Sequence, residues 1–222
     1  MKHILYLLYF LLICSACTWG PYRFPGVRPN DIRILPYFEP VALIDFIDKG
    51  EQIAFSDSLS RIAEEKMDSI LTAGGAGFPL GERLSFMDQE QKERFRNELH
   101  ELANLFARRG NVSGITLPRT VNSLLKSRDS RFGLATVAIG YGRSKASQRQ
   151  QVVQSVAIGV LSGGTYVPLP VKSSIRMFAF VFDAELNQVL FFHITPAENR
   201  DPTHPEALRR HLAKLYRGFY YE

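Results

Sequence analysis

Cysteine is almost absent from this sequence: the 222 residues include two, Cys14 and Cys17, and none after them. A disulfide framework is therefore excluded beyond residue 17, and stability has to come from a hydrophobic core, which about 200 residues can form. Long apolar runs are also missing. Residues 4–13 are the longest, whereas a helix that crosses ~30 Å of hydrocarbon needs roughly 20 residues. A transmembrane helix is thus not expected.

Low-complexity tracts and a strong excess of one charge are absent as well. The chain is 45% hydrophobic and 22% charged, which is the composition of an ordinary globular domain. Its net charge of +5 is mildly basic. For an exported protein this charge favours anionic headgroups or acidic partners over nucleic acid.

The first residues carry the three parts of a secretory signal. Lys2 is followed by the apolar run 4–13 and by two small residues, Ser15 and Ala16. With Cys17 directly after them, the pattern resembles a bacterial lipobox, and this resemblance implies a diacylglyceryl thioether on Cys17. The alternative is ordinary signal cleavage near Ala16, which would leave Cys17 as a free thiol.

Three segments follow from this interpretation. Residues 1–16 are the predicted lipoprotein signal peptide, and the mature protein starts at Cys17, anchored to a membrane. Residues 17–30 contain several glycines and prolines, which is typical of a tether. Residues 31–222 are predicted to form one α/β domain.

Hydrophobic spacing, caps and turn residues predict the elements of this domain. In chain order they are a strand over 32–43, a helix from Asp57 to Gly74, a short strand within 82–87, a helix from Asp88 to Gly110, a helix from Thr116 to Ser127, a strand over 132–141, a hairpin of strands 175–183 and 188–194 turning at Asn187, and a helix capped by Thr203 with Glu206. Pro36 and Pro40 predict that the first strand is bent or bulged.

The predicted fold class is α/β (α+β), with a single mixed β-sheet flanked by helices. Residues 132–141 are apolar on both alternating faces, so they should form the centre of the sheet. Val137 and Ile139 are expected to be buried there, with Phe178 and Phe180 on a neighbouring strand.

The order strand, helix, strand, helix, helix, strand, hairpin, helix resembles the small α/β domain of TolB amino termini and of the secretion lipoprotein CsgG. Residues 34–38, Ile-Leu-Pro-Tyr-Phe, are similar to the opening strand of that family. The chain as a whole, including residues 157–161 and 167–172, also resembles envelope lipoproteins of Bacteroidota. These resemblances imply a mixed sheet and an envelope location, and they imply no activity.

Residues 144–174 form a long excursion before the hairpin, well beyond the usual two to six residues. Apolar residues recur in it at helical spacing, namely Val152, Val153, Val156 and Val160, and they follow Lys145 and Arg149. One interpretation is a helix packed over an open face of the sheet. The other is a segment that contacts a membrane or a partner protein.

The last predicted helix has a basic face made by Arg209, Arg210, Lys214 and Arg217. Such a face is either solvated or a site for headgroups or an acidic partner.

Catalytic motifs are not evident. The cluster His193, Glu198, Asp201, His204 and His211 contains metal-ligand residue types, but its spacing does not place three ligands on one helix face, and solvated or capping roles are the alternative. We therefore predict a lipid-anchored binding or assembly component of the cell envelope, with an envelope protein partner and neither catalysis nor a cofactor. One alternative is a metal-dependent periplasmic hydrolase that uses His193, Asp201 and His204. Another is a membrane-inserting subunit that uses residues 148–170.

Overall fold

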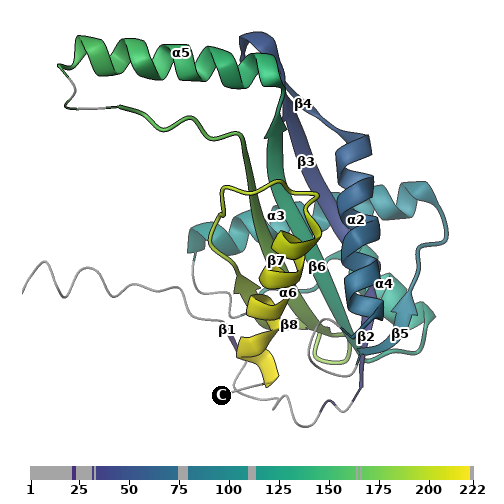
Figure 1. The fold of residues 1–222 in the computed structure, drawn as a ribbon. Helices are drawn as coiled ribbons and strands as arrows, with labels where there is room; N and C mark the ends of the chain where they lie inside the picture. The colour runs from purple at the N-terminus through teal and green to yellow at the C-terminus, as the bar shows by residue number, and fades with distance from the viewer. Residues whose placement is uncertain are drawn as a thin grey trace, which may run out of the picture.

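The computed structural model describes residues 22–23, 32, 34–74, 80–109, 114–163, 165 and 167–220. Within them the chain forms one mixed sheet with helices on both faces (Figure 1), which confirms the predicted fold class. Helices α2 (Asp57–Thr72) and α6 (Pro205–Tyr220) cover one face, whereas α3 (Gln89–Arg109) and α4 (Arg119–Ser127) cover the other. Among the described helices, none is both long and apolar enough to cross a bilayer. The predicted signal peptide and Cys17 lie outside the described residues.

The centre of the sheet is β6 (Phe132–Arg143), as predicted from its apolar character on both faces. Its antiparallel neighbour is β7 (Ser173–Asp183). Its parallel neighbours, β2 (Leu35–Phe38) and β3 (Val41–Ile47), follow each other along the opposite edge of β6. The outer strands are β8 (Gln188–Ile194) and β1 (Tyr22–Arg23) beyond β7, β5 (Leu80–Leu84) beyond β2, and β4 (Ile53–Phe55) beyond β3.

The single bent strand predicted over 32–43 is in fact two strands. The break falls at Glu39 and Pro40, because proline has no N–H to continue the ladder. Pro36 lies where the register between β2 and β5 shifts, so the expected bulge is present. Splitting the strand lets β2 pair with β5 while β3 pairs with β4.

Polar side chains of α2 protect the outer edge of β3. The backbone N–H of Ala42 donates to Glu64 Oε1 at 2.9 Å, and that of Ile44 donates to Ser60 Oγ at 3.1 Å. Glu64 also accepts from Lys92 Nζ at 2.6 Å and from Arg96 Nη2 at 3.1 Å, both on α3. One buried carboxylate therefore connects the two helical layers around a strand edge that would otherwise expose unpaired backbone groups.

Two predicted helix starts are confirmed. Helix α2 begins at Asp57, where Ser56 Oγ accepts from the N–H of Leu59. At the start of α3, Asp88 Oδ1 accepts from the N–H of Gln91 at 2.7 Å, and Gln91 Oε1 accepts from the N–H of Met87 at 2.9 Å. The first bond is the one expected of a capping box, whereas the return bond reaches the N–H of Met87, one residue before the cap, in place of that of Asp88.

Two predicted caps are wrong. Thr116 pairs with Gln188 in an isolated bridge, and α4 begins only after Pro118, where Glu98 of α3 accepts from the N–H and hydroxyl of Thr120. Thr203 likewise does not cap α6: its hydroxyl donates to Asp201 Oδ1 in the preceding turn. In both places a carboxylate takes the capping or turn-forming role that the local pattern assigned to threonine.

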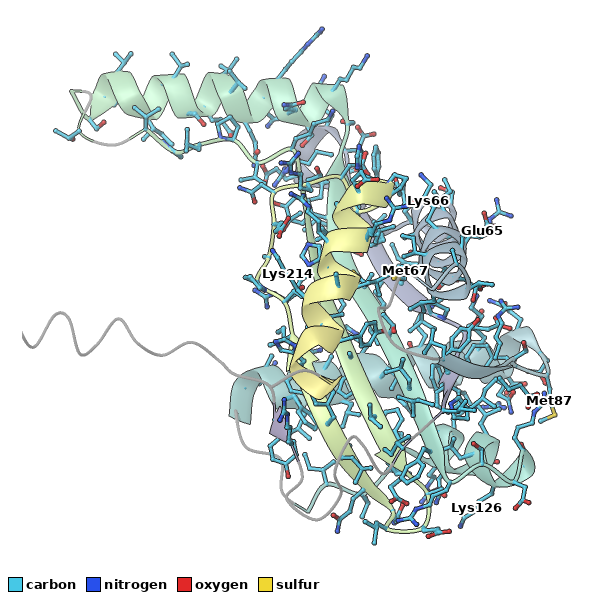
Figure 2. The ribbon with its side chains drawn as sticks, turned by 60° about the horizontal axis from the view of Figure 1, so that its bottom comes forward. Glu65, Lys66, Met67, Met87, Lys126 and Lys214 are labelled. Carbon is cyan, nitrogen blue, oxygen red and sulfur yellow. The ribbon has the colours of Figure 1, made fainter. Side chains whose placement is uncertain are left out.

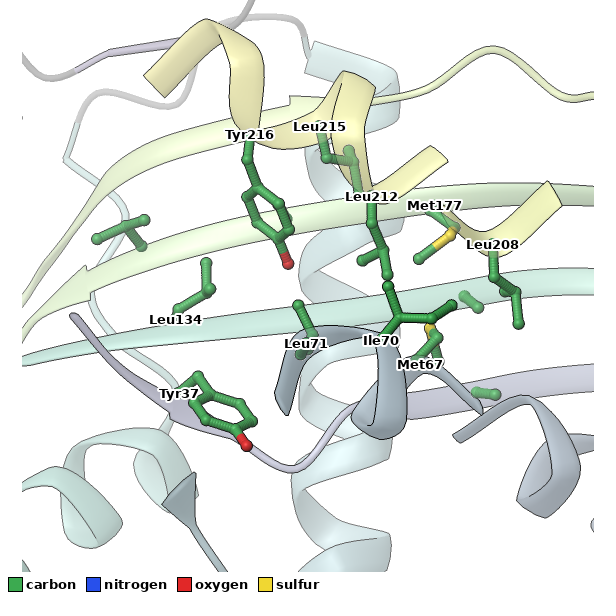
Figure 3. Packing of buried hydrophobic residues seen from close by; sticks show 14 of the residues in the cluster. Tyr37, Met67, Ile70, Leu71, Leu134, Met177, Leu208, Leu212, Leu215 and Tyr216 are labelled. Carbon is green, nitrogen blue, oxygen red and sulfur yellow. The ribbon is translucent and has the colours of Figure 1, made fainter. Parts of the chain in front are cut away.

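The core has two halves, one on each face of β6. Under α2 and α6 the first half contains Met67, Ile70, Leu208 and Leu212, which lie together near Met177 (Figure 3). In this half the hydroxyl of Thr136 on β6 forms a hydrogen bond with the hydroxyl of Tyr216, and burial raises the pKa of Tyr216, so its phenol stays neutral.

The second half, under α3 and α4, is rich in phenylalanine. Phe38 and Phe95 have ring centroids 4.9 Å apart, and Phe106 and Phe192 have centroids 4.2 Å apart. Val137 is fully buried here opposite Phe178, as predicted, and Phe180 is buried too. Ile139 is only partly buried, because it lies at the periphery of this half of the core.

The hairpin between β7 and β8 is confirmed, with Asn187 in the left-handed region at φ 51°. The buried carboxylate of Asp183 organises its turn. Asp183 Oδ1 accepts from the N–H groups of Glu185 and Leu186, and Oδ2 accepts from Arg131 Nη2 at 3.0 Å. This hydrogen bond raises the pKa of Arg131.

Candidate interaction site

Residues 144–172 leave the end of the β6–β7 hairpin and extend beyond the sheet (Figure 1), and we call them the arm. Helix α5 (Lys145–Leu161) forms its outward half. The described residues 162–163, 165 and 167–172 form its return half, and residues 167–172 are in no regular structure. The interpretation of this helix as a cover for an open sheet face is therefore wrong, because both faces are already covered by other helices.

The base of the arm is fixed to the domain by hydrogen bonds. The N–H of Ser144 donates to the carbonyl of Ile47 at 2.9 Å, and Ser144 Oγ caps α5 by accepting from the N–H of Ser147. The N–H of Gly50 donates to Gln150 Oε1 at 3.2 Å. The direction of the arm is thus set by its first turn and a half.

Small residues allow the two halves of the arm to lie together. Ser147, Ser155 and Gly159 are the buried positions of α5. A methyl group at Gly159 would lie 2.9 Å from Val167 Cγ2, closer than side chains normally approach. Helix α5 therefore has Gly159 against the return half and leaves its larger apolar side chains outside.

The four predicted valines, Val152, Val153, Val156 and Val160, are all exposed, with 68% of Val153 and 76% of Val160 accessible. At 100° per residue they lie within one arc of about 100° around the helix axis. We call them the valine stripe. The structure thus brings all four together on one face.

Sequence reasoning missed three further exposed apolar residues of the arm, namely Ile158, Val167 and Leu169. It also missed the clearest signal in the sequence: residues 150–171 contain no charged side chain. That gap identifies a segment that is exposed yet poorly suited to water.

Four exposed cations lie near the base of the arm, where the exposed carboxylates of Asp48 and Glu51 also contact it. Lys145, Arg149, Lys172 and Arg176 are exposed, and none has an ion-pair partner among the described residues. Arg143 differs, because it lies 3.5 Å from Glu51 Oε1. We call the four unpaired residues the basic collar.

The predicted basic face of α6 is largely neutralised. Arg209 pairs with Glu206, while Lys214 Nζ and Arg210 Nη2 lie 2.6 and 3.3 Å from the two oxygens of Glu198. The hydrogen bond from Lys214 is the main reason why the pKa of Glu198 is lowered. The side chain of Arg217 lies outside the described residues. This face therefore contributes less free positive charge than its sequence indicated.

The predicted metal-ligand cluster does not converge. Within the described part of the chain, no three His, Cys, Asp or Glu side chains are placed to hold a metal ion. His193 Nδ1 donates a hydrogen bond to the carbonyl of Leu215. Asp201 Oδ1 accepts from the N–H of Thr203 in the turn before α6. His211 is buried with Nδ1 2.6 Å from Thr195 Oγ1, and burial lowers its pKa. His204 lies at the exposed start of α6.

Comparisons with known proteins do not assign the chain to a family. No protein-family description and no curated protein matches the chain. Among solved structures, the PelC dodecamer from Paraburkholderia phytofirmans is 10% identical with a TM-score of 0.36, covering 91% of this chain and 96% of that one. A PelC variant from the same organism is 9% identical with a TM-score of 0.35. The similarity to TolB, CsgG and Bacteroidota lipoproteins stays a prediction.

Proposed function

We propose that this protein is a lipid-anchored binding or assembly component of the cell envelope, without covalent chemistry, and that the arm is its contact surface. One observation carries the proposal: the arm extends away from a core that is complete without it, and it exposes the valine stripe to solvent. Exposed apolar clusters on a folded domain are typical of surfaces that bind something else.

The proposed lipid anchor is inferred from the lipobox-like pattern that ends at Cys17. Strand β1 begins at Tyr22, five residues later, and five residues of extended chain span at most about 18 Å. The sheet would therefore be held close to the membrane surface, where the arm can meet an envelope partner.

The hydrolase alternative has less support, because His193 and Asp201 are engaged in hydrogen bonds within the fold and no three metal-ligand side chains converge among the described residues. The membrane-inserting alternative depends on the arm and is developed in the next subsection. No cofactor and no nucleic acid enter the proposal.

The anchor can be tested by mass spectrometry of the mature protein. We expect its amino-terminal fragment to begin at Cys17 and to carry a diacylglyceryl thioether. A Cys17→Ser protein exported behind an ordinary cleavable signal should lose this mass and leave the membrane fraction after a high-salt wash. An unmodified wild-type chain beginning at residue 18 or later would contradict the proposal.

The arm can be removed without disturbing the sheet. Gly142 of β6 pairs with Ser173 of β7, so replacing residues 144–172 by Asn-Gly leaves a three-residue hairpin loop, Arg143-Asn-Gly. We expect this variant to unfold cooperatively near the wild-type temperature, because loop closure depends weakly on length. It should lose the partners that the anchored wild-type protein recovers from cross-linked envelopes.

Met87→Glu is the matched control, because Met87 is an exposed apolar residue on the side of the molecule away from the arm (Figure 2). It should recover every partner. If the arm-deleted protein fails to fold, the arm is part of the core; if it folds and keeps all partners, the contact surface lies elsewhere. Either result would contradict the proposal.

A further inference from the structure

We propose that the surface met by the arm is an anionic lipid bilayer, with the valine stripe and Leu161 inserted at the boundary between headgroups and acyl chains. This inference rests on the proposed function and names the partner of the same site. It is carried by the combination of a charge-free apolar arm and an unpaired basic collar at its base.

The charge pattern matches a lipid surface. Residues 150–171 are uncharged, and the exposed charges that flank them, Lys145, Arg149 and Lys172, are all positive. Peripheral membrane segments show the same arrangement, with apolar side chains below the headgroups and cations among them. Because the collar has no acidic partners within the described residues, its charge is available to anionic headgroups.

Apolar side chains are exposed on more than one side of the arm. Val153 and Ile158 are both exposed and lie about 140° apart around the helix axis. On the return half, 86% of Leu169 is accessible, and at the helix end 87% of Leu161 is accessible. A rigid protein groove covers one face of a helix, whereas a fluid lipid environment contacts every inserted side. This distribution favours lipid over a protein groove.

The backbone of the return half limits how deep the arm can go. Residues 167–172 form no backbone hydrogen bonds with other described residues, and such groups are not tolerated in the hydrocarbon core. The part of α5 from Val152 to Leu161 is about 15 Å long, half the thickness of the hydrocarbon layer. The arm therefore lies in the interface of one leaflet and does not span the bilayer.

Helix α5 extends toward the same side of the molecule as β1, although the two lie at opposite ends of the sheet (Figure 1). In Figure 1, α5 runs from the end of β6 toward the side on which β1 lies at the sheet edge. With Cys17 five residues before β1, one membrane surface can hold both the acyl chains and the arm.

Vesicle flotation of the unlipidated mature protein, made with Cys17→Ser behind a cleavable signal, tests the inference. We expect flotation with vesicles of phosphatidylcholine and phosphatidylglycerol, and weaker binding to phosphatidylcholine alone or in high salt. Val153→Glu combined with Val160→Glu should reduce the affinity at least about tenfold, because both carboxylates would have to leave water. Lys145→Gln and Arg149→Gln should each reduce it about fivefold for the anionic vesicles only.

Met87→Glu should bind like the parent and controls for the added negative charge. The inference is overturned if the unlipidated protein floats with neither vesicle, or if the double glutamate variant floats as well as the parent. If flotation overturns the inference but deleting the arm still removes the cross-linked protein partners of the anchored protein, the proposed function stands and the partner of the arm is a protein. If flotation overturns the inference and the arm-deleted protein keeps those partners, both proposals fail.

Discussion

Replacing Val137 by aspartate is expected to lower the free energy of unfolding by about 3–5 kcal/mol, against a typical total of about 5–15 kcal/mol. Val137 is fully buried at the centre of β6, opposite Phe178 and under α3 and α4. A carboxylate there has neither water nor a cation, so it must either stay charged without a partner or take up a proton at a cost. Urea unfolding followed by circular dichroism measures the change.

Val153→Asp is the matched control, because it makes the same chemical change where 68% of the side chain is exposed. Its free energy of unfolding should stay within about 0.5 kcal/mol of wild type. A Val137→Asp protein as stable as this control would show that β6 is not the centre of the sheet.

Glu64→Leu, which removes the carboxylate, should lower the free energy of unfolding by about 2–4 kcal/mol, the second-largest loss that we expect. The N–H of Ala42 would lose its acceptor at the edge of β3, and Lys92 and Arg96 would face each other without a counter-charge. Glu64→Gln should lose less, since its amide oxygen can still accept from Ala42.

Glu65 provides the control for this prediction. It is the next residue of α2, and its side chain points into solvent (Figure 2). Glu65→Leu should leave the free energy of unfolding within about 0.5 kcal/mol of wild type. Equal stability of the Glu64→Leu and Glu65→Leu proteins would mean that the contacts of Glu64 contribute nothing net to stability.

Elements whose signals are local could be predicted from the sequence. Helices α2 and α3 follow from apolar residues every three or four positions and from caps such as Asp88 with Gln91. The hairpin at Asn187 follows from a residue that tolerates positive φ between two β-branched runs. The central position of β6 follows from apolar residues on both faces, since only a strand covered on both sides needs them.

Features that depend on distant residues could not be predicted. Glu98 and Asp201 displaced the expected threonine caps, because an ionised acceptor from another helix or turn competes with a local hydroxyl. In the sequence, nothing distinguishes Glu64 and Asp183 from the other charged residues. They are buried only because the fold brings backbone N–H groups and cations around each of them.

The candidate site likewise combines a local feature that the sequence predicts with a feature that only the fold determines. By itself, the sequence determined that residues 152–160 form an apolar stripe on a helix, because side-chain spacing alone sets which residues share a face. Whether the protein's own core covers that stripe was decided by the tertiary structure. Helices α2, α6, α3 and α4 already occupy both faces of the sheet, so α5 extends beyond it and its valines remain exposed. Burial depends on what else competes for the same surface, and helical periodicity carries no information about that competition.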